Sequence, residues 1–260
     1  MPQSTSITTI DRSARPNFLI PVMQFALAML RAALNDLRGT IVQMITPLFL
    51  LGLFWLTTRG GERGDQLMTF MFPSLIGLTV MLAGQPLAIR VVNWRQQGIF
   101  QRLAATPAPL GHLVLGAALA QLAISLIQCA VMMGLGLALG LKIEPLGALM
   151  AVGVLTLGAA GFISYGALLS GFSAKAETVS ALFTFTLMPV YFLGGGFPPE
   201  ILPEFVRAIA PYLPTTMLTT LLNGLINAGH LPENALMSLA GLAVYTFIFA
   251  GVTTQTFRWE

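Results

Sequence analysis

The chain alternates long uncharged apolar stretches with short polar segments, and six of the stretches approach the length of a membrane-crossing helix. A helix needs about 20 apolar residues to cross the hydrocarbon core of a bilayer. The pattern therefore predicts an all-α membrane protein with six transmembrane helices. The predicted spans are Thr40–Thr57, Leu67–Ile89, Leu113–Leu141, Leu146–Ser170, Val179–Leu193 and Asn234–Phe257.

The fifth predicted span is short and runs directly into residues that break helices. These residues are Gly194, Gly195, Gly196, Pro198 and Pro199. Because glycine and proline disfavour helix continuation, we expect the span to end at this point. The missing length of the fifth span must therefore come from the residues that follow it, before the sixth span begins.

The composition agrees with a membrane protein. Hydrophobic residues make up 55% of the 260 residues and charged residues only 9%, whereas a soluble domain carries about 25% charge. Membrane lipids are therefore expected partners. The predicted spans contain no charged side chain. Proton relays and ion-coupled carriers usually place an ionisable group inside the bilayer, so the pattern argues against those functions.

The basic residues predict the orientation. Six spans place both termini on one side, and if that side is the cytoplasm it carries nine of the 13 Lys and Arg residues. The nine are Arg12, Arg15, Arg31, Arg38, Arg90, Arg95, Arg102, Lys175 and Arg258, and the four outside are Arg59, Arg63, Lys142 and Arg207. Cytoplasmic loops are enriched in such residues, so both termini are predicted to be cytoplasmic. No basic cluster typical of nucleic-acid binding is present, and no nucleic-acid partner is expected.

Two segments precede the first span. Residues 1–16 are polar and predict a disordered cytoplasmic tail. Residues 17–39 predict an interfacial amphipathic helix, with Gln24, Arg31 and Arg38 on one face and leucines on the opposite face. This helix is either a simple membrane anchor or a lever that passes motion from a cytoplasmic partner. Residues 40–260 then form the transmembrane domain, which includes a loop at 90–112.

The sequence offers little chemistry of its own. His112 and His230 fall on opposite membrane sides, and no paired carboxylates or metal-binding spacing occur inside the spans. A nucleotide-binding Walker A loop ends in Lys followed by Ser or Thr, and neither Lys142 nor Lys175 is followed by either residue. We therefore predict no catalytic residue, no metal site and no cofactor bound by this chain.

The loop between the second and third spans has helical character from Val91 to Ala105. Ile99, Phe100 and Leu103 share one side of this helix, and Pro107 stops it. A short amphipathic helix with aromatic and arginine residues is typical of a knob that fits a groove in a partner. An interfacial loop with ordinary cytoplasmic arginines would show the same composition.

A resemblance to type-2 ATP-binding-cassette (ABC) exporter permeases is carried by the run Arg95-Gln-Gln-Gly98-Ile-Phe-Gln-Arg102-Leu-Ala-Ala-Thr106-Pro107. In that family an Arg-acidic-x-Gly-Thr-Leu stretch precedes Leu-x-x-Thr-Pro. Gln96 stands in place of the acidic residue here, and Ile99 in place of Thr. The end of the fifth span, from Pro189 to Pro214, is similar to the family's Gly-Gly/Pro break, which is followed by a re-entrant pair of short outer helices and Pro-x-x-Pro. The resemblance implies a re-entrant segment at 194–233, with short helices at Pro203–Ala210 and Thr215–Ile226. The resemblance extends over almost the whole chain.

The resemblance implies a permease that works with two ABC ATPase subunits, which would bind ATP and Mg²⁺, and with a second copy of itself or a paralogous permease. It implies export of a hydrophobic or amphipathic substrate, drug-like or lipid-linked, across the plasma membrane of a bacterial cell by alternating access. The implied ATPase-coupling residues are Arg95, Gln97, Gly98, Phe100, Arg102, Leu103, Thr106 and Pro107. Lys175 and Glu177 are candidates for a second coupling contact.

Residues for the substrate pathway are predicted from polarity and aromatic character inside the spans. Gln85, next to a predicted Gly/Pro kink, is the first candidate, and Phe183, Phe185 and Tyr191 of the fifth span are the others. The aromatic residues suit lipid-facing packing equally well. The rival functions are a non-catalytic membrane assembly or channel subunit and, with less support, a lipid-modifying membrane enzyme.

Overall fold

Every element in the described part of the chain is helical. The computed structural model describes residues 19–35, 37–58, 62–105, 110–197 and 202–256, and these contain no β-strand. The helices are α1 (Leu19–Asn35), α2 (Leu37–Thr58), α3 (Glu62–Leu82), α4 (Gly84–Gln96), α5 (Ile99–Ala104), α6 (Leu110–Ala138), α7 (Pro145–Ser170), α8 (Ala176–Tyr191), α9 (Glu204–Ile209), α10 (Pro214–Asn223) and α11 (Ala235–Thr256). Two π-helical turns, Phe192–Gly196 and Gly224–Ala228, extend α8 and α10.

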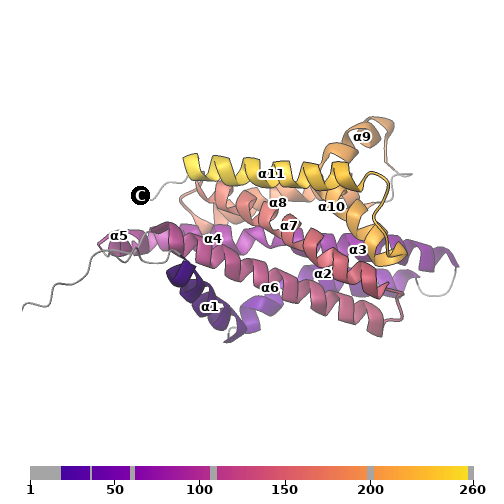
Figure 1. Ribbon diagram of the computed structural model, residues 1–260, viewed down its shortest axis with the longest axis horizontal. Coiled ribbons are helices and arrows are strands. Elements are labelled where there is room, and N and C mark those ends of the chain that lie inside the picture. The colour runs from indigo at the N-terminus through magenta and orange to yellow at the C-terminus, as the bar shows by residue number, and fades with distance from the viewer. Residues whose placement is uncertain (1–18, 36, 59–61, 106–109, 198–201, 257–260) are drawn as a thin grey trace, which may run out of the picture.

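Six helical segments are long and apolar enough to cross a membrane, which confirms the six predicted spans. They are Ile41–Thr58, Gln66–Gln96, Leu110–Ala138, Pro145–Ser170, Ala176–Gly196 and Ala235–Thr256. Figure 1 shows the bundle that they form along the long axis of the molecule, with α5 at one end and α9 toward the other. We call these two ends the α5 end and the α9 end.

The second span differs most from its prediction. The prediction ended it at Ile89, whereas helix continues from Gln66 to Gln96 with a single interruption at Ala83. Pro86 has no N–H group to donate to the carbonyl four residues earlier, which weakens the helix at this point. At the interruption, the N–H of Ala83 bonds to the carbonyl of Val80, three residues earlier, at 3.1 Å. Arg90 therefore lies on the spanning helix α4 and not in a loop.

Helix α7 lies at the centre of the bundle, where it packs against α4, α6 and α11. Its contact with α4 is made backbone to backbone. A Cβ atom at Gly166 of α7 would overlap the carbonyl of Gly84, and a Cβ atom at Gly84 would overlap the carbonyl of Phe162. Small residues allow membrane helices to approach this closely, so the α4–α7 contact fixes α4 in the bundle.

Helix α1 crosses the α5 end obliquely and packs along α6 (Figure 1). Val22 and Ala26 are buried there, and a Cβ atom at Gly116 of α6 would lie 2.7 Å from the Cβ of Phe25. The predicted apolar face, which includes Met23 and Leu27, is exposed. The sequence predicted one polar face and one apolar face on this helix. The structure adds a third face, with Val22 and Ala26, that packs on protein. The position of α1 at a membrane surface stays a prediction.

The α4–α7 contact yields a stability prediction with an internal control. We expect Gly166→Ala to lower stability by about 1–3 kcal/mol, because the new methyl group must push two helix backbones apart. Gly153→Ala on the same helix meets nothing within 4 Å and should raise stability by about 0.5–1 kcal/mol through helix propensity. Thermal unfolding of the purified full chain measures both effects. Equal shifts in the two variants would contradict the close approach.

Candidate functional site

Helices α4 and α5 meet at a sharp elbow at the α5 end. The N–H of Gln97 bonds to the Asn93 carbonyl at 2.9 Å and that of Gly98 bonds to the Arg95 carbonyl at 3.0 Å, which ends α4. Gly98 then has a φ of +64°, a left-handed conformation that a side chain would disfavour by about 1–2 kcal/mol. The predicted single helix from Val91 to Ala105 is therefore wrong, because a left-handed residue cannot continue a right-handed helix.

Arg102 holds the elbow closed. Its Nη2 donates to the Gln97 carbonyl at 2.6 Å, and its Nε is 3.4 Å from the Gly98 carbonyl. Gln97 is the C-cap of α4, where carbonyls without a partner in the helix give a partial negative charge that a cation stabilises. The Gly98 carbonyl also accepts the backbone N–H of Arg102 at the start of α5. The exposed guanidinium of Arg102 thus fixes the angle between the two helices.

Helix α5 is seated on the bundle by its apolar side. Phe100 is only 2% exposed, and its ring meets that of Trp94 edge to face with centroids 6.2 Å apart. Leu103 is half-buried. Of the predicted coupling residues, these two anchor α5 from inside, while Gln97 and Arg102 are exposed. Thr106 and Pro107 lie outside the described residues.

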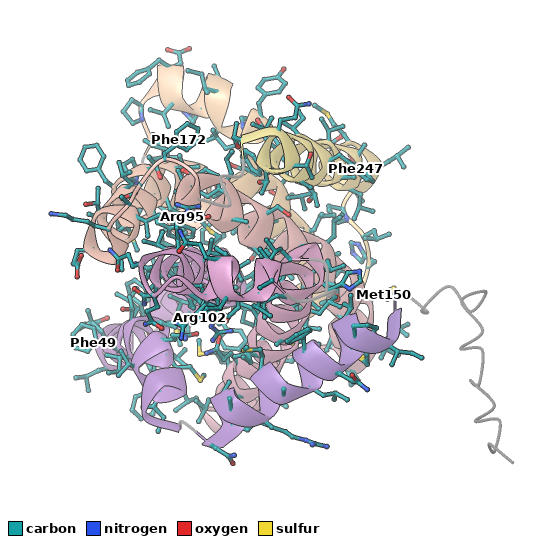
Figure 2. All side chains as sticks on the ribbon, turned by 90° about the vertical axis from the view of Figure 1, so that its left-hand side faces the viewer. Phe49, Arg95, Arg102, Met150, Phe172 and Phe247 are labelled. Carbon is teal, nitrogen blue, oxygen red and sulfur yellow. The ribbon has the colours of Figure 1, made fainter. Side chains whose placement is uncertain are left out.

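The elbow is tied to the connection between α7 and α8. Nη1 of Arg95 donates to the Ser170 carbonyl at 3.0 Å and is 3.4 Å from that of Ser173. The side-chain amide of Gln96 donates to the Ala174 carbonyl at 2.7 Å. Figure 2, which looks onto this end, shows Arg95 and Arg102 on either side of the α4–α5 ribbon.

This tie brings the two predicted coupling contacts together. Lys175 and Glu177 follow directly after Ala174, and both are exposed. The connection is itself ordered by Ser173, whose Oγ accepts from the N–H of Lys175 at 3.2 Å. The elbow and the α7–α8 connection therefore form one surface at the α5 end, which we call the coupling surface.

Gln96 replaces an acidic residue of the resembling family, and the structure gives the substitution a physical role. An amide has N–H donors for the Ala174 carbonyl, whereas an ionised carboxylate can only accept hydrogen bonds. The tie from position 96 to Ala174 thus requires a donor such as glutamine.

A cavity of about 700 Å³ opens between α2, α4 and α8. Gln85 lies on its wall, and its amide donates to Ser180 Oγ at 2.7 Å and lies 3.4 Å from Thr184 Oγ1, both on α8. Gln43 of α2 also lines it and accepts from the Gln128 amide of α6 at 3.5 Å. The lining combines amides and hydroxyls with the apolar side chains Val42, Leu82, Pro86, Ile89, Trp94 and Met188.

Arg90 is the charged residue that the sequence prediction placed elsewhere. Among the described residues that line the cavity it alone is charged, and its Nη1 is buried without a hydrogen-bond acceptor in the described part of the chain. The lining positions 82, 85, 86, 89, 90, 93, 94 and 97 repeat at helical spacing. Extending the helix past Ile89 would have revealed this face from the sequence.

The predicted pathway residues occupy different environments. Gln85 lines the cavity. Phe183 is 0% exposed and packs against Tyr165, with ring centroids 5.7 Å apart, and Tyr191 is also buried. Phe185 is 79% exposed on the outer face of α8. The structure therefore brings Gln85 to an open cavity and places the three aromatic residues away from it.

The glycine-rich break at the α9 end is stabilised by α10. Contrary to expectation, helical hydrogen bonding continues through Gly194 as a π turn to Gly196, and Gly195 takes a φ of +157°. Thr215 Oγ1 donates to the Val190 carbonyl at 3.0 Å, and Thr219 Oγ1 lies 3.4 Å from that of Gly194. Hydroxyls of α10 thus bond carbonyls of the irregular segment, as backbone at membrane depth requires. Pro198 and Pro199 lie outside the described residues.

Residues 56–254 match the sequence profile of the ABC-2 family transporter proteins. The chain belongs to this family, and it is a multi-pass permease subunit of the ABC class. The matched region includes the elbow, the α7–α8 connection and the glycine-rich break. No curated protein matched the sequence.

The hydrogen bond from Gln96 to Ala174 can be tested by replacing the amide of Gln96, which donates, with a carboxylate, which only accepts. We expect Gln96→Glu to break the bond to Ala174, which is worth about 1 kcal/mol, and to speed amide exchange at Phe172 and Lys175 about fivefold. Hydrogen exchange of the full chain, read by peptide mass, measures this change. Gln101→Glu makes the same charge change on the exposed side of α5 and should leave those amides unaffected. Unchanged exchange in Gln96→Glu would show that the tie does not order the connection.

Proposed function

We propose that this chain is the permease subunit of an ATP-driven exporter for a hydrophobic or amphipathic substrate, drug-like or lipid-linked. Two copies of the chain, or one copy and a paralogous permease, pair with two ABC ATPase subunits. ATP and Mg²⁺ bind to the ATPase subunits. The proposal places the complex in the plasma membrane of a bacterial cell, with both termini in the cytoplasm.

The proposal is carried by the direct contact between α5 and the cavity wall. Phe100 of α5 packs against Trp94, and Trp94 itself lines the cavity. Arg95 and Gln96, which tie the elbow to the α7–α8 connection, lie on the same helix, α4, as the cavity residue Trp94. A force applied to α5 from outside the bundle reaches the cavity through one aromatic contact and one rigid helix.

In this mechanism the coupling surface docks into a cleft of the ATPase. Closure of the ATPase on ATP pushes on α5, and the elbow held by Arg102 passes the motion to α4. Movement of α4 against α2 and α8 closes the cavity on the cytoplasmic side, and the α9 end opens. The two states alternate because ATP binding favours one of them and hydrolysis restores the other.

A bulky substitution on the exposed side of α5 tests docking without disturbing the bundle. Ala104 is exposed, so we expect Ala104→Trp to leave the fold intact and to reduce ATPase binding and permease-stimulated ATP hydrolysis about tenfold or more. The measurement uses the full chain captured with its ATPase subunit and reconstituted in vesicles.

The matched control is Ala32→Trp on α1, an exposed alanine at the same end of the bundle. It should retain both properties. Full ATPase binding and stimulated hydrolysis in Ala104→Trp would refute docking at α5. A full chain that moves substrate without any ATPase would refute the proposed function as a whole.

The proposed orientation predicts which cysteines a membrane-impermeant maleimide reaches. Cys129 is buried, so an introduced cysteine is the reporter. In intact cells Lys142→Cys should react and Lys175→Cys should not, and in inside-out vesicles the pattern should reverse. Both lysines are exposed in the structure, so a cysteine that fails to react is shielded by the membrane and not by burial in the protein. The opposite labelling pattern would place the coupling surface outside the cell.

A further inference from the structure

The cavity between α2, α4 and α8 contains an unusual combination of a single cation and a mixed lining. Arg90 projects from α4 among amides contributed by Gln43, Gln85 and Asn93. The remaining lining is apolar or hydroxylic apart from a further amide at Gln97, and no acidic residue is found among the described lining residues. The charge of Arg90 is thus not neutralised by the described wall of the cavity.

One nitrogen of the Arg90 guanidinium also lacks a hydrogen-bond acceptor among the described residues. Nη1 is buried, and no described atom accepts from it. A buried charged donor is expensive unless an acceptor is present, so such groups in native proteins are usually paired. Arg102 nearby shows the normal situation, because its guanidinium donates to the backbone carbonyls of Gln97 and Gly98.

The amides around the cavity bond in different ways. Gln43 accepts through its carbonyl oxygen from the amide of Gln128, whereas Gln85 donates through its amide to Ser180 and Thr184. Arg90 is the charged group in the described lining, and it can only donate. Carboxylate, phosphate and sulfate groups accept several hydrogen bonds and pair with guanidinium groups in charge-assisted geometry. The polar side of the cavity therefore suits an anion.

The apolar side of the same cavity suits a hydrocarbon chain. Val42, Ile89 and Met188 come from the three different helices and enclose it together with Trp94. A ligand that carried only an anionic group would leave these side chains without contact, and one without an anionic group would leave Arg90 without a partner.

We propose that this cavity binds amphipathic anions, with the anionic group held by Arg90 and the hydrocarbon part against the apolar wall. Resting on the proposed export function, the inference assigns the substrate to the class of amphipathic carboxylates, phosphates or sulfates. The same chemistry occurs in the headgroup of an anionic lipid, and the proposal commits to the transported molecule rather than to a resident lipid.

Trp94 provides the readout, because it lines the cavity beside Arg90. The full chain carries Trp55→Phe and Trp259→Phe, so that Trp94 is the remaining tryptophan of three. It is reconstituted in phosphatidylcholine nanodiscs at a pH where a fatty carboxylate is ionised. The probes are stearate with a nitroxide quencher near the carboxylate and its methyl ester, which has the same chain without the charge.

We expect saturable quenching of Trp94 by the anion and only linear, partition-type quenching by the ester. Arg90→Gln should raise the half-saturating concentration of the anion about tenfold or more, the factor for losing a charge-assisted hydrogen bond. Arg90→Lys should recover part of the binding. Arg31→Gln, the same charge change at an exposed site on α1, should leave binding unchanged. A stearate with its quencher at the far end of the chain should quench less.

Three outcomes would overturn the inference. Equal saturable binding of anion and ester, or unchanged binding in Arg90→Gln with an unaltered unfolding temperature, would show that Arg90 recognises no anion. Loss of stearate binding when phosphatidylglycerol is added to the discs would assign the site to a resident lipid headgroup instead of a substrate. Retained binding in phosphatidylglycerol, together with stimulation of the complete complex by the anion, is the expected result.

The assay keeps the inference separate from the proposed function. Binding is measured without an ATPase, whereas coupling is measured by the effect of Ala104→Trp on the complete complex. A chain that couples normally but binds anion and ester alike refutes the inference alone. A chain that binds the anion at Arg90 but never engages an ATPase refutes the proposed function and leaves only a binding site.

Discussion

The need to pair every carbonyl exposed where a helix ends or bends governs both ends of this bundle. Backbone groups that the protein shields from water need a partner from within the protein, and in a bilayer no water is available to them. At the α5 end the donors are Arg95, Gln96 and Arg102, which bond carbonyls of the elbow and of the α7–α8 connection. At the α9 end the donors are the hydroxyls of Thr215 and Thr219 on α10. The residues that resemble a functional motif are therefore also those that make its backbone possible.

Helix α4 joins these constraints to the cavity. Gly84 fixes one end of α4 against α7, and the tied elbow fixes the other. Between these ends α4 carries the cavity residues Gln85, Arg90 and Trp94. A helix held at both ends moves as one body, so a displacement at the elbow changes the position of Arg90 relative to α2 and α8. The geometry needs no long chain of intermediate contacts to connect the two sites.

The sequence predicted the number and approximate limits of the spans, because uncharged stretches of sufficient length have few alternatives in a membrane protein. It misplaced the end of the second span because Arg90 was taken as a mark of the loop, although a long side chain on a helix can lie in a protein cavity. It also predicted an unbroken helix through Gly98, since apolar periodicity does not report a positive φ.

The sequence predicted where the candidate site lies along the chain better than it predicted the side-chain contacts of that site. The motif around Gly98 located the elbow, but its side-chain bonds depend on the α7–α8 connection, more than 70 residues away in sequence. The exposure of an aromatic side chain depends on which neighbours its helix face meets. Those neighbours bury Phe100 and Phe183 and leave Phe185 exposed. That information is tertiary, and a single sequence contains no direct signal for it.

The unpaired guanidinium of Arg90 gives the cavity a means to sense its contents. A ligand shifts a conformational equilibrium only by the difference between its affinities for the two states. An anion that bridges Arg90 on α4 and the amide of Gln43 on α2 has its best geometry at one separation of these helices. Movement of α4 alters that separation and therefore the affinity. Binding of the anion and movement of the elbow are then linked by thermodynamic reciprocity, so a substrate that binds more tightly in one state also biases the coupling surface toward that state.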